Sequence, residues 1–127
     1  MNVKQVIVMR NDLNMRKGKM IAQGAHAACA FMQRKLLLAA DGVCAYSANE
    51  MELAWQRGLF TKVCVRADSE AELLRVYEEA KAAGLTVELI TDAGKTEFNG
   101  VPTHTCLAVG PDLAEKIDAI TGDLKLL

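Results

Sequence analysis

The chain lacks both an excess of charge and a long apolar run, and each absence excludes a class of protein. Fifteen Lys and Arg residues stand against sixteen Asp and Glu residues, which gives a formal net charge of −1. A histone-like or tail-like nucleic-acid binder is therefore excluded, and any polyanion must be held by a local basic patch. The longest uncharged run, residues 20–33, has 14 residues, whereas a membrane-spanning helix needs roughly 18. We expect no such helix.

The sequence also lacks the usual signals of metal binding, disulfides and secretion. Its cysteines and histidines are few and scattered: Cys29, Cys44, Cys64, Cys106, His26 and His104. They form no CxxC pair and no HExxH pattern, so we expect no metal site, no cofactor and no disulfide. Three of the four cysteines have apolar neighbours, as core cysteines do. The N-terminus shows no signal-peptide pattern, so we expect the protein to remain in the cytoplasm.

Strand and helix patterns alternate along the chain. The 127 residues, 51% of them hydrophobic, suit one domain and are too few for two. Strand patterns occupy residues 3–9, 61–65, 87–90 and 105–109. Helical patterns occupy residues 18–32, 49–58, 69–84 and 111–122. This order predicts a single three-layer α/β domain over residues 1–127, with a mixed, mostly parallel four-stranded sheet flanked by helices.

Local signals mark the ends of two of these helices. Asn49 is a candidate N-cap, and Gly58 follows the end of the same short helix. Ser69 and Glu72 have the spacing of a capping box, and Gly84 stands where a left-handed C-terminal residue is favoured.

A basic segment follows the first strand, at the edge where open α/β sheets bind ligands. Residues 10–19 contain one carboxylate, Asp12, and four cations: Arg10, Arg16, Lys17 and Lys19. The start of a helix near Gly18 adds unpaired N–H groups and the positive end of a dipole, which favour a phosphate or carboxylate. A solvated basic turn explains the same residues equally well.

A polar line runs along the helix that follows. Lys19, Gln23 and His26 lie at i, i+4 and i+7 and therefore share one face. The rest of this helix is rich in small and apolar residues, so the polar line faces either solvent or a cleft. For His26 a hydrogen-bonded structural role stays open.

The segment DAGKT, residues 92–96, follows a predicted strand. Asp92 either caps the glycine turn or presents a carboxylate to a cleft. A phosphate-binding Walker loop is excluded because its first glycine falls on Leu89. No GxSxG elbow is present and no cysteine lies in an evident electropositive turn, so nucleophilic catalysis has no candidate. A site that activates water by acid-base chemistry is the remaining hydrolytic option.

Several strings in this order resemble a known family, the archaeal and eukaryotic (second) type of peptidyl-tRNA hydrolase. They are RNDLNMRKGKMIAQGAHA at 10–27, DAGKT at 92–96, TCLAVGP at 105–111 and ITGDLKLL at 120–127. The resemblance implies a small α/β fold with a mixed sheet, no metal, and cleavage of the ester that joins a peptide to the 3′ end of tRNA. The segment 36–58 is longer and more apolar than the resemblance leads us to expect.

The same resemblance implies site residues. Lys19, Gln23 and His26 match the helix signature, and Asp92 and Thr96 match the loop signature. The threonine that opens the last strand matches Thr105, which keeps TCLAVGP aligned as a unit, with Thr103 as the alternative.

Ester hydrolysis then suggests a role for each catalytic candidate. Asp92 orients or deprotonates the water, and Lys19 pairs with Asp92 and stabilises the oxyanion or the terminal phosphate. His26 anchors the substrate or shuttles a proton. The remaining candidates bind substrate: Gln23, Thr96, Thr105, Arg16 and Lys17.

Two other functions stay open at this point. A non-catalytic module that binds tRNA or a protein would use the same basic turn and helix, although it has no use for the Asp92 carboxylate. A hydrolase of a related aminoacyl ester is the other. The apolar residues 36–40 favour a self-association surface and hence a homodimer, or else the end of a core helix.

Overall fold

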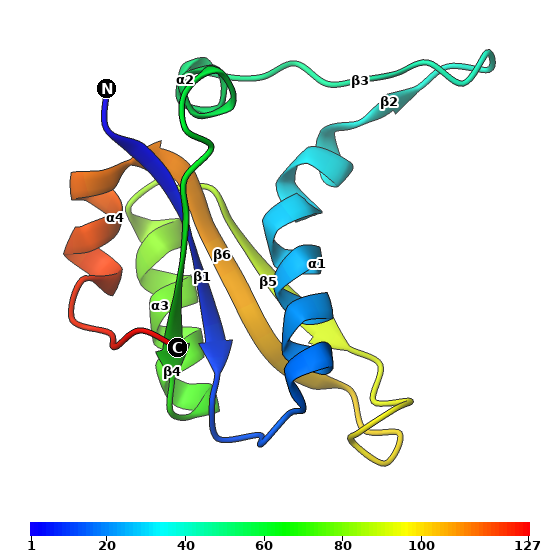
Figure 1. Ribbon diagram of the computed structural model, residues 1–127, viewed down its shortest axis with the longest axis vertical. Helices are drawn as coiled ribbons and strands as arrows, with labels where there is room; N and C mark the ends of the chain where they lie inside the picture. The colour runs from blue at the N-terminus through cyan, green and yellow to red at the C-terminus, as the bar shows by residue number, and fades with distance from the viewer.

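Four strands form one mixed sheet in the order β4-β1-β6-β5 (Figure 1). The computed structural model describes residues 1–127. The strands are β1 (Val3–Arg10), β4 (Lys62–Ala67), β5 (Val87–Asp92) and β6 (Thr103–Leu113). The helices are α1 (Lys17–Lys35), α2 (Glu50–Arg57), α3 (Glu70–Ala82) and α4 (Ala114–Thr121). The predicted α/β class, the mixed sheet and the four strands are confirmed.

The sheet differs from the prediction in its pairing. β1 and β4 pair in parallel, whereas β6 is antiparallel to both β1 and β5. Three strands therefore run in one direction and only β6 opposes them. Because β6 lies between β1 and β5, two of the three pairings are antiparallel, and the expectation of a mostly parallel sheet is wrong for the pairing.

The helices cover the two faces of this sheet (Figure 1). Helices α3 and α4 pack on one face over the larger core cluster, which contains Val6, Val8, Leu73 and Ile117. Helix α1 covers the other face, where small residues such as Ala27 and Ala28 contact the sheet in the second cluster. Neither α1 nor any other helix is long and apolar enough to cross a membrane.

The predicted helix signals are confirmed where they are local. The Asn49 side chain accepts from the Glu52 N–H, and Ser69 Oγ accepts from the Glu72 N–H. Gly84 has a φ of +74°. The predicted start of the last helix at residue 111 is wrong, because β6 continues to Leu113 by pairing with β1. Long-range pairing prevails there over the local pattern.

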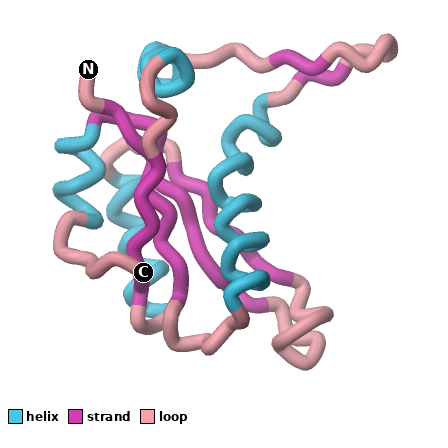
Figure 2. Tube along the Cα trace, in the orientation of Figure 1, coloured by secondary structure: helices cyan, strands magenta, loops and turns pink.

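Between α1 and α2 the chain leaves the body of the protein as an extended arm (Figure 2), whose residues 36–45 are all exposed. The arm contains a two-stranded hairpin of β2 (Leu37–Leu38) and β3 (Cys44–Ala45) that the sequence pattern did not indicate. The expectation for cysteine also changes, because Cys29 on α1, Cys44 in the arm and Cys64 on β4 are exposed and only Cys106 is buried. Apolar neighbours in the sequence therefore did not predict which cysteines are buried.

Candidate active site

The polar residues singled out in the sequence meet at one end of the sheet. Strands β1 and β5 end there with Arg10 and Asp92, and β6 begins there with Thr103. Helix α1 starts at the same end, the lower end in Figure 1. The direction of β6 thus brings its first residues beside the last residues of its two neighbours.

Lys19 and Asp92 form the central ion pair. Lys19 Nζ lies 2.8 Å from Asp92 Oδ1 and donates a second hydrogen bond to Thr96 Oγ1 at 2.7 Å. The side chains of Lys19 and Asp92 are only 13% and 14% exposed. Solvent therefore screens this pair less than an ordinary surface ion pair. An ammonium group has three N–H donors, so one remains for a substrate.

Gln23 joins this pair to the last strand. Its Nε2 donates to Asp92 Oδ1 at 3.3 Å, and its Oε1 accepts a hydrogen bond from the buried Thr105 Oγ1. Thr103 instead donates to the Val101 carbonyl. Of the two threonines considered for this position, Thr105 is the one that contacts the hydrogen-bonded cluster of Lys19, Gln23, Asp92 and Thr96.

The surroundings of Asp92 favour its charged form. The hydrogen bond from Lys19 is the largest influence that holds the pKa of Asp92 below its ordinary value. The Gly94 N–H, the Lys19 charge and the Gln23 amide act in the same direction, while burial opposes them. Asp92 is therefore an ionised carboxylate at neutral pH and a weak base.

Gly94 is a site residue that the sequence reasoning left without a role. Its N–H donates to Asp92 Oδ2 at 2.9 Å, so Asp92 both caps the glycine turn and pairs with Lys19. Gly94 has a φ of +81°, and a Cβ there would clash with the Val101 carbonyl oxygen. The Asp-x-Gly spacing after a strand was the signal that could have identified it.

His26 lies on the same side of α1 but outside the hydrogen-bonded cluster. It is exposed and lines a groove of about 390 Å³ together with Gln23, Thr91 and Asp92. The His26 side chain makes no hydrogen bond to another residue, so the structure brings the ring near the cluster without fixing it there.

The basic segment divides into two groups. Arg16 and Lys17 are exposed at the start of α1, and only a 3.9 Å contact links Arg16 to Glu97. Arg10 is buried among Asp12, Glu70 and the His104 carbonyl. It therefore does not contribute to the basic surface that the sequence suggested.

The buried cysteine beside the cluster is not poised as a nucleophile. Cys106 Sγ lies 3.3 Å from the Gln23 carbonyl oxygen, and burial raises the pKa of its thiol to about 11. A thiol with this pKa stays protonated at neutral pH. No group of three or more His, Cys, Asp and Glu side chains is arranged to hold a metal ion.

We predict that Lys19→Met raises the pKa of Asp92, because it removes the largest favourable contact and leaves the effect of burial. The ¹³C chemical shift of the Asp92 carboxyl, followed against pH, measures this. Lys17→Met is the matched control and should leave the titration unchanged. The stabilisation from this pair is present above the unfolded carboxyl pKa and is lost as the pH falls through the lower folded pKa. An identical titration in Lys19→Met and the wild type would contradict this account.

Comparison with known proteins agrees with the resemblance seen in the sequence. The family described as "Peptidyl-tRNA hydrolase PTH2" matches residues 3–127. A peptidyl-tRNA hydrolase of Methanocaldococcus jannaschii is 44% identical over 128 residues, covering 98% of this chain and 100% of that protein. One of Methanothermobacter thermautotrophicus is 42% identical over 125 residues, with 98% and 100% covered. A probable peptidyl-tRNA hydrolase 2 of Drosophila melanogaster is 40% identical over 126 residues, covering 99% of this chain and 62% of that protein. The chain belongs to the peptidyl-tRNA hydrolase PTH2 family.

Proposed function

We propose that this protein hydrolyses the ester between a peptide, or an N-blocked amino acid, and the 3′ end of tRNA, releasing tRNA for reuse. The observation that carries the proposal is the Lys19–Asp92 pair at the sheet end, in a chain that belongs to this family over almost its whole length. A module that only binds a polyanion gains nothing from a carboxylate in its cleft. The catalytic function is therefore favoured over a non-catalytic binding module.

The pKa of Asp92 restricts how it can act on water. A carboxylate with a lowered pKa is a weak general base, so we assign it the orientation of the attacking water and of Lys19 rather than strong proton abstraction. The third N–H of Lys19 is assigned to the oxyanion that forms on the ester carbonyl, or to the terminal phosphate. A donor already in place for developing charge needs little reorganisation during the reaction.

The other candidates divide by their access to the groove. Thr96 is exposed, and Gln23 and His26 line the groove, so these three are assigned to hold the ester or the water. His26 is also a candidate proton shuttle because an imidazole ring has one nitrogen that can accept a hydrogen bond or proton and another that can donate one. Thr105 is fully buried and acts on substrate only through Gln23.

The proposal extends to the setting of the reaction. Residues 1–127 act as one functional domain, and the reaction takes place in the cytoplasm, without a metal or other cofactor. Arg16 and Lys17 contact the phosphate backbone of tRNA next to the site. The arm residues 36–40 pair two copies into a homodimer.

Asp92→Asn should lower kcat about 10²-fold or more, because it removes the carboxylate that orients the attacking water and Lys19. Release of a labelled N-acetyl-aminoacyl group from tRNA measures this after treatment with a chelator, which should leave wild-type cleavage unchanged. Asp123→Asn, at an exposed position, is the control and should match the wild type. Tight tRNA binding without wild-type cleavage would favour the binding module, and equal activity of Asp92→Asn would remove Asp92 from the site.

Arg16→Gln combined with Lys17→Gln should raise KM and leave kcat unchanged, because both side chains are exposed and neither contacts Asp92. Each lost phosphate contact also lowers the slope of log KM against log salt concentration by about 0.7 to 0.9. Kinetics between low and moderate salt measure both effects. Lys116→Gln on α4, which packs on the opposite face of the sheet, is the matched control. An unchanged salt slope in the double variant would exclude these contacts.

The homodimer proposal rests on the arm. Leu37 and Leu38 are 72% and 73% exposed on a two-residue strand, and an isolated hairpin of this kind is at best marginally stable in water. Leu37→Glu with Leu38→Glu should convert a concentration-dependent dimer to monomer in sedimentation velocity. Leu59→Glu, at a residue 94% exposed outside the arm, should leave the dimer intact. A monomeric wild type at every concentration would refute the dimer.

A further inference from the structure

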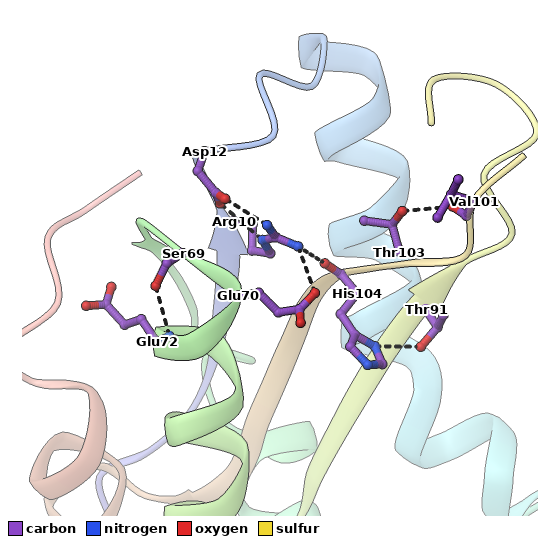
Figure 3. A network of polar contacts seen from close by, with 9 residues as sticks. All are labelled: Arg10, Asp12, Ser69, Glu70, Glu72, Thr91, Val101, Thr103 and His104. Atoms are coloured by element: carbon purple, nitrogen blue, oxygen red, sulfur yellow. Dashed lines mark hydrogen bonds and ion pairs between the residues drawn. The ribbon is translucent and has the colours of Figure 1, made fainter. Parts of the chain in front are cut away.

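Arg10 is a buried cation whose contacts all lie within the protein (Figure 3). Its side chain is 9% exposed. Nε and Nη2 bind the two carboxylate oxygens of Asp12 at 3.1 and 2.7 Å, while Nη1 reaches Glu70 Oε2 at 3.5 Å. Nη1 also donates to the carbonyl oxygen of His104 at 3.0 Å. The guanidinium thus joins the end of β1 to the β1–α1 turn, the start of α3 and the start of β6.

The carbonyl that Arg10 holds lies next to a β-bulge. In the pairing of β5 with β6, Ile90 is opposite Cys106 and Thr91 is opposite His104. Thr105 therefore has no partner in β5 and is the extra residue of the bulge. The pairing of β6 with β1 ends at Cys106 and Met9, one residue before Arg10. A bulge of this kind redirects a side chain and ends regular pairing.

His104 is fixed from two sides. Its carbonyl oxygen accepts from Arg10, and its ring Nδ1 lies 2.9 Å from Thr91 Oγ1 on the neighbouring strand (Figure 3). The residue before the bulge therefore has both its backbone and its side chain held. This leaves Thr105, the next residue, with a defined direction.

The Gln23 amide bridges Thr105 and Asp92. Gln23 Nε2 donates to Asp92, and Gln23 Oε1 accepts from Thr105 Oγ1. The carboxylate can only accept, so it selects the nitrogen end of the amide. The hydroxyl inside the bulge then holds the oxygen end and keeps the amide in place on the carboxylate.

We propose that Arg10 is a positioning residue for the ester hydrolysis: by holding the His104 carbonyl it fixes the bulge that presents Thr105 to Gln23, and so holds the Gln23 amide in place on Asp92. This inference rests on the proposed function. Arg10 itself does not line the groove. Its contribution is to the geometry of the carboxylate's surroundings.

Arg10→Gln should lower kcat roughly 10- to 100-fold, as a small misplacement of a catalytic group does. KM should stay within about twofold, since a buried side chain makes no phosphate contact. Arg66→Gln is the matched control: Arg66 lies on β4 at the same end of the sheet and pairs with Asp68 at 3.4 Å, without contact to His104. It should keep wild-type kcat. A raised KM with normal kcat in Arg10→Gln would make Arg10 a tRNA contact and overturn the proposal.

A double-mutant cycle separates positioning from general destabilisation. If Arg10 acts through Thr105, Arg10→Gln combined with Thr105→Val should cost no more in kcat than Thr105→Val alone. Losses that multiply would overturn the proposal. If Arg10→Gln does not fold, Arg10→Lys replaces it, because lysine keeps the charge and lacks the planar fork. The same loss of kcat at unchanged KM is then expected, and full activity of Arg10→Lys would overturn the proposal.

NMR shifts, which can be measured without enzymatic activity, test the positioning role of Arg10 separately from the proposed function. The ¹⁵N and ¹H shifts of the Gln23 side-chain amide should change in Arg10→Gln and stay constant in Arg66→Gln. Unchanged amide shifts in Arg10→Gln would overturn the positioning role even if the wild type is an active hydrolase. If the amide shifts change in Arg10→Gln but the wild type cleaves no peptidyl-tRNA, the contact network is as described and the proposed function is wrong.

Discussion

The position of β6, antiparallel between β1 and β5, is the constraint on which the site depends. Because β6 opposes its neighbours, its first residues lie at the end where β1 and β5 finish. Thr105 from β6 thereby comes within hydrogen-bond distance of Gln23 on α1, and Gln23 in turn reaches Asp92 on β5. A strand parallel to its neighbours would carry its first residues to the other end of the sheet. The site is thus a product of strand direction as much as of residue identity.

The packing of α1 is the second condition, because it sets the distance between the helix and the sheet. Gly24, Ala27 and Ala28 are buried against the sheet, where larger side chains would hold the helix further away. Interiors at native packing density transmit such changes in volume. The polar line of α1 runs beside this small-residue face, so Lys19 and Gln23 reach Asp92 at 2.8 and 3.3 Å. The close packing of α1 on the sheet is therefore what brings these two side chains within hydrogen-bond distance of Asp92.

Local sequence signals predicted the parts of this structure that depend on neighbours in the chain. The caps at Asn49 and Ser69 and the turn at Gly84 are set by residues within a few positions and were predicted correctly. The central position of β6, its extension to Leu113 and the bulge at Thr105 depend on pairing between distant segments. Spacing alone did not separate Thr103 from Thr105, since residues two apart share one face of a regular strand. Lys19, Gln23 and Asp92 were found together because the resemblance supplied the long-range relation that their spacing lacks. Arg10 was read as surface charge because two of its partners, Glu70 and the His104 carbonyl, are distant in the sequence.

The contacts that hold Asp92 also limit its chemistry. Oδ1 accepts from Lys19 and Gln23, and Oδ2 accepts from the Gly94 N–H, so both oxygens are engaged by the protein. Each of these bonds fixes the carboxylate more firmly and lowers its pKa further. Rigidity and basicity are thus opposed at this residue. In the proposed reaction the gain must therefore come from a water and an oxyanion held in place, with Lys19 carrying the electrostatic part, rather than from a strong base. The Gln23 amide, which Thr105 holds from its far side, therefore contributes to the placement of the Asp92 carboxylate rather than to its basicity.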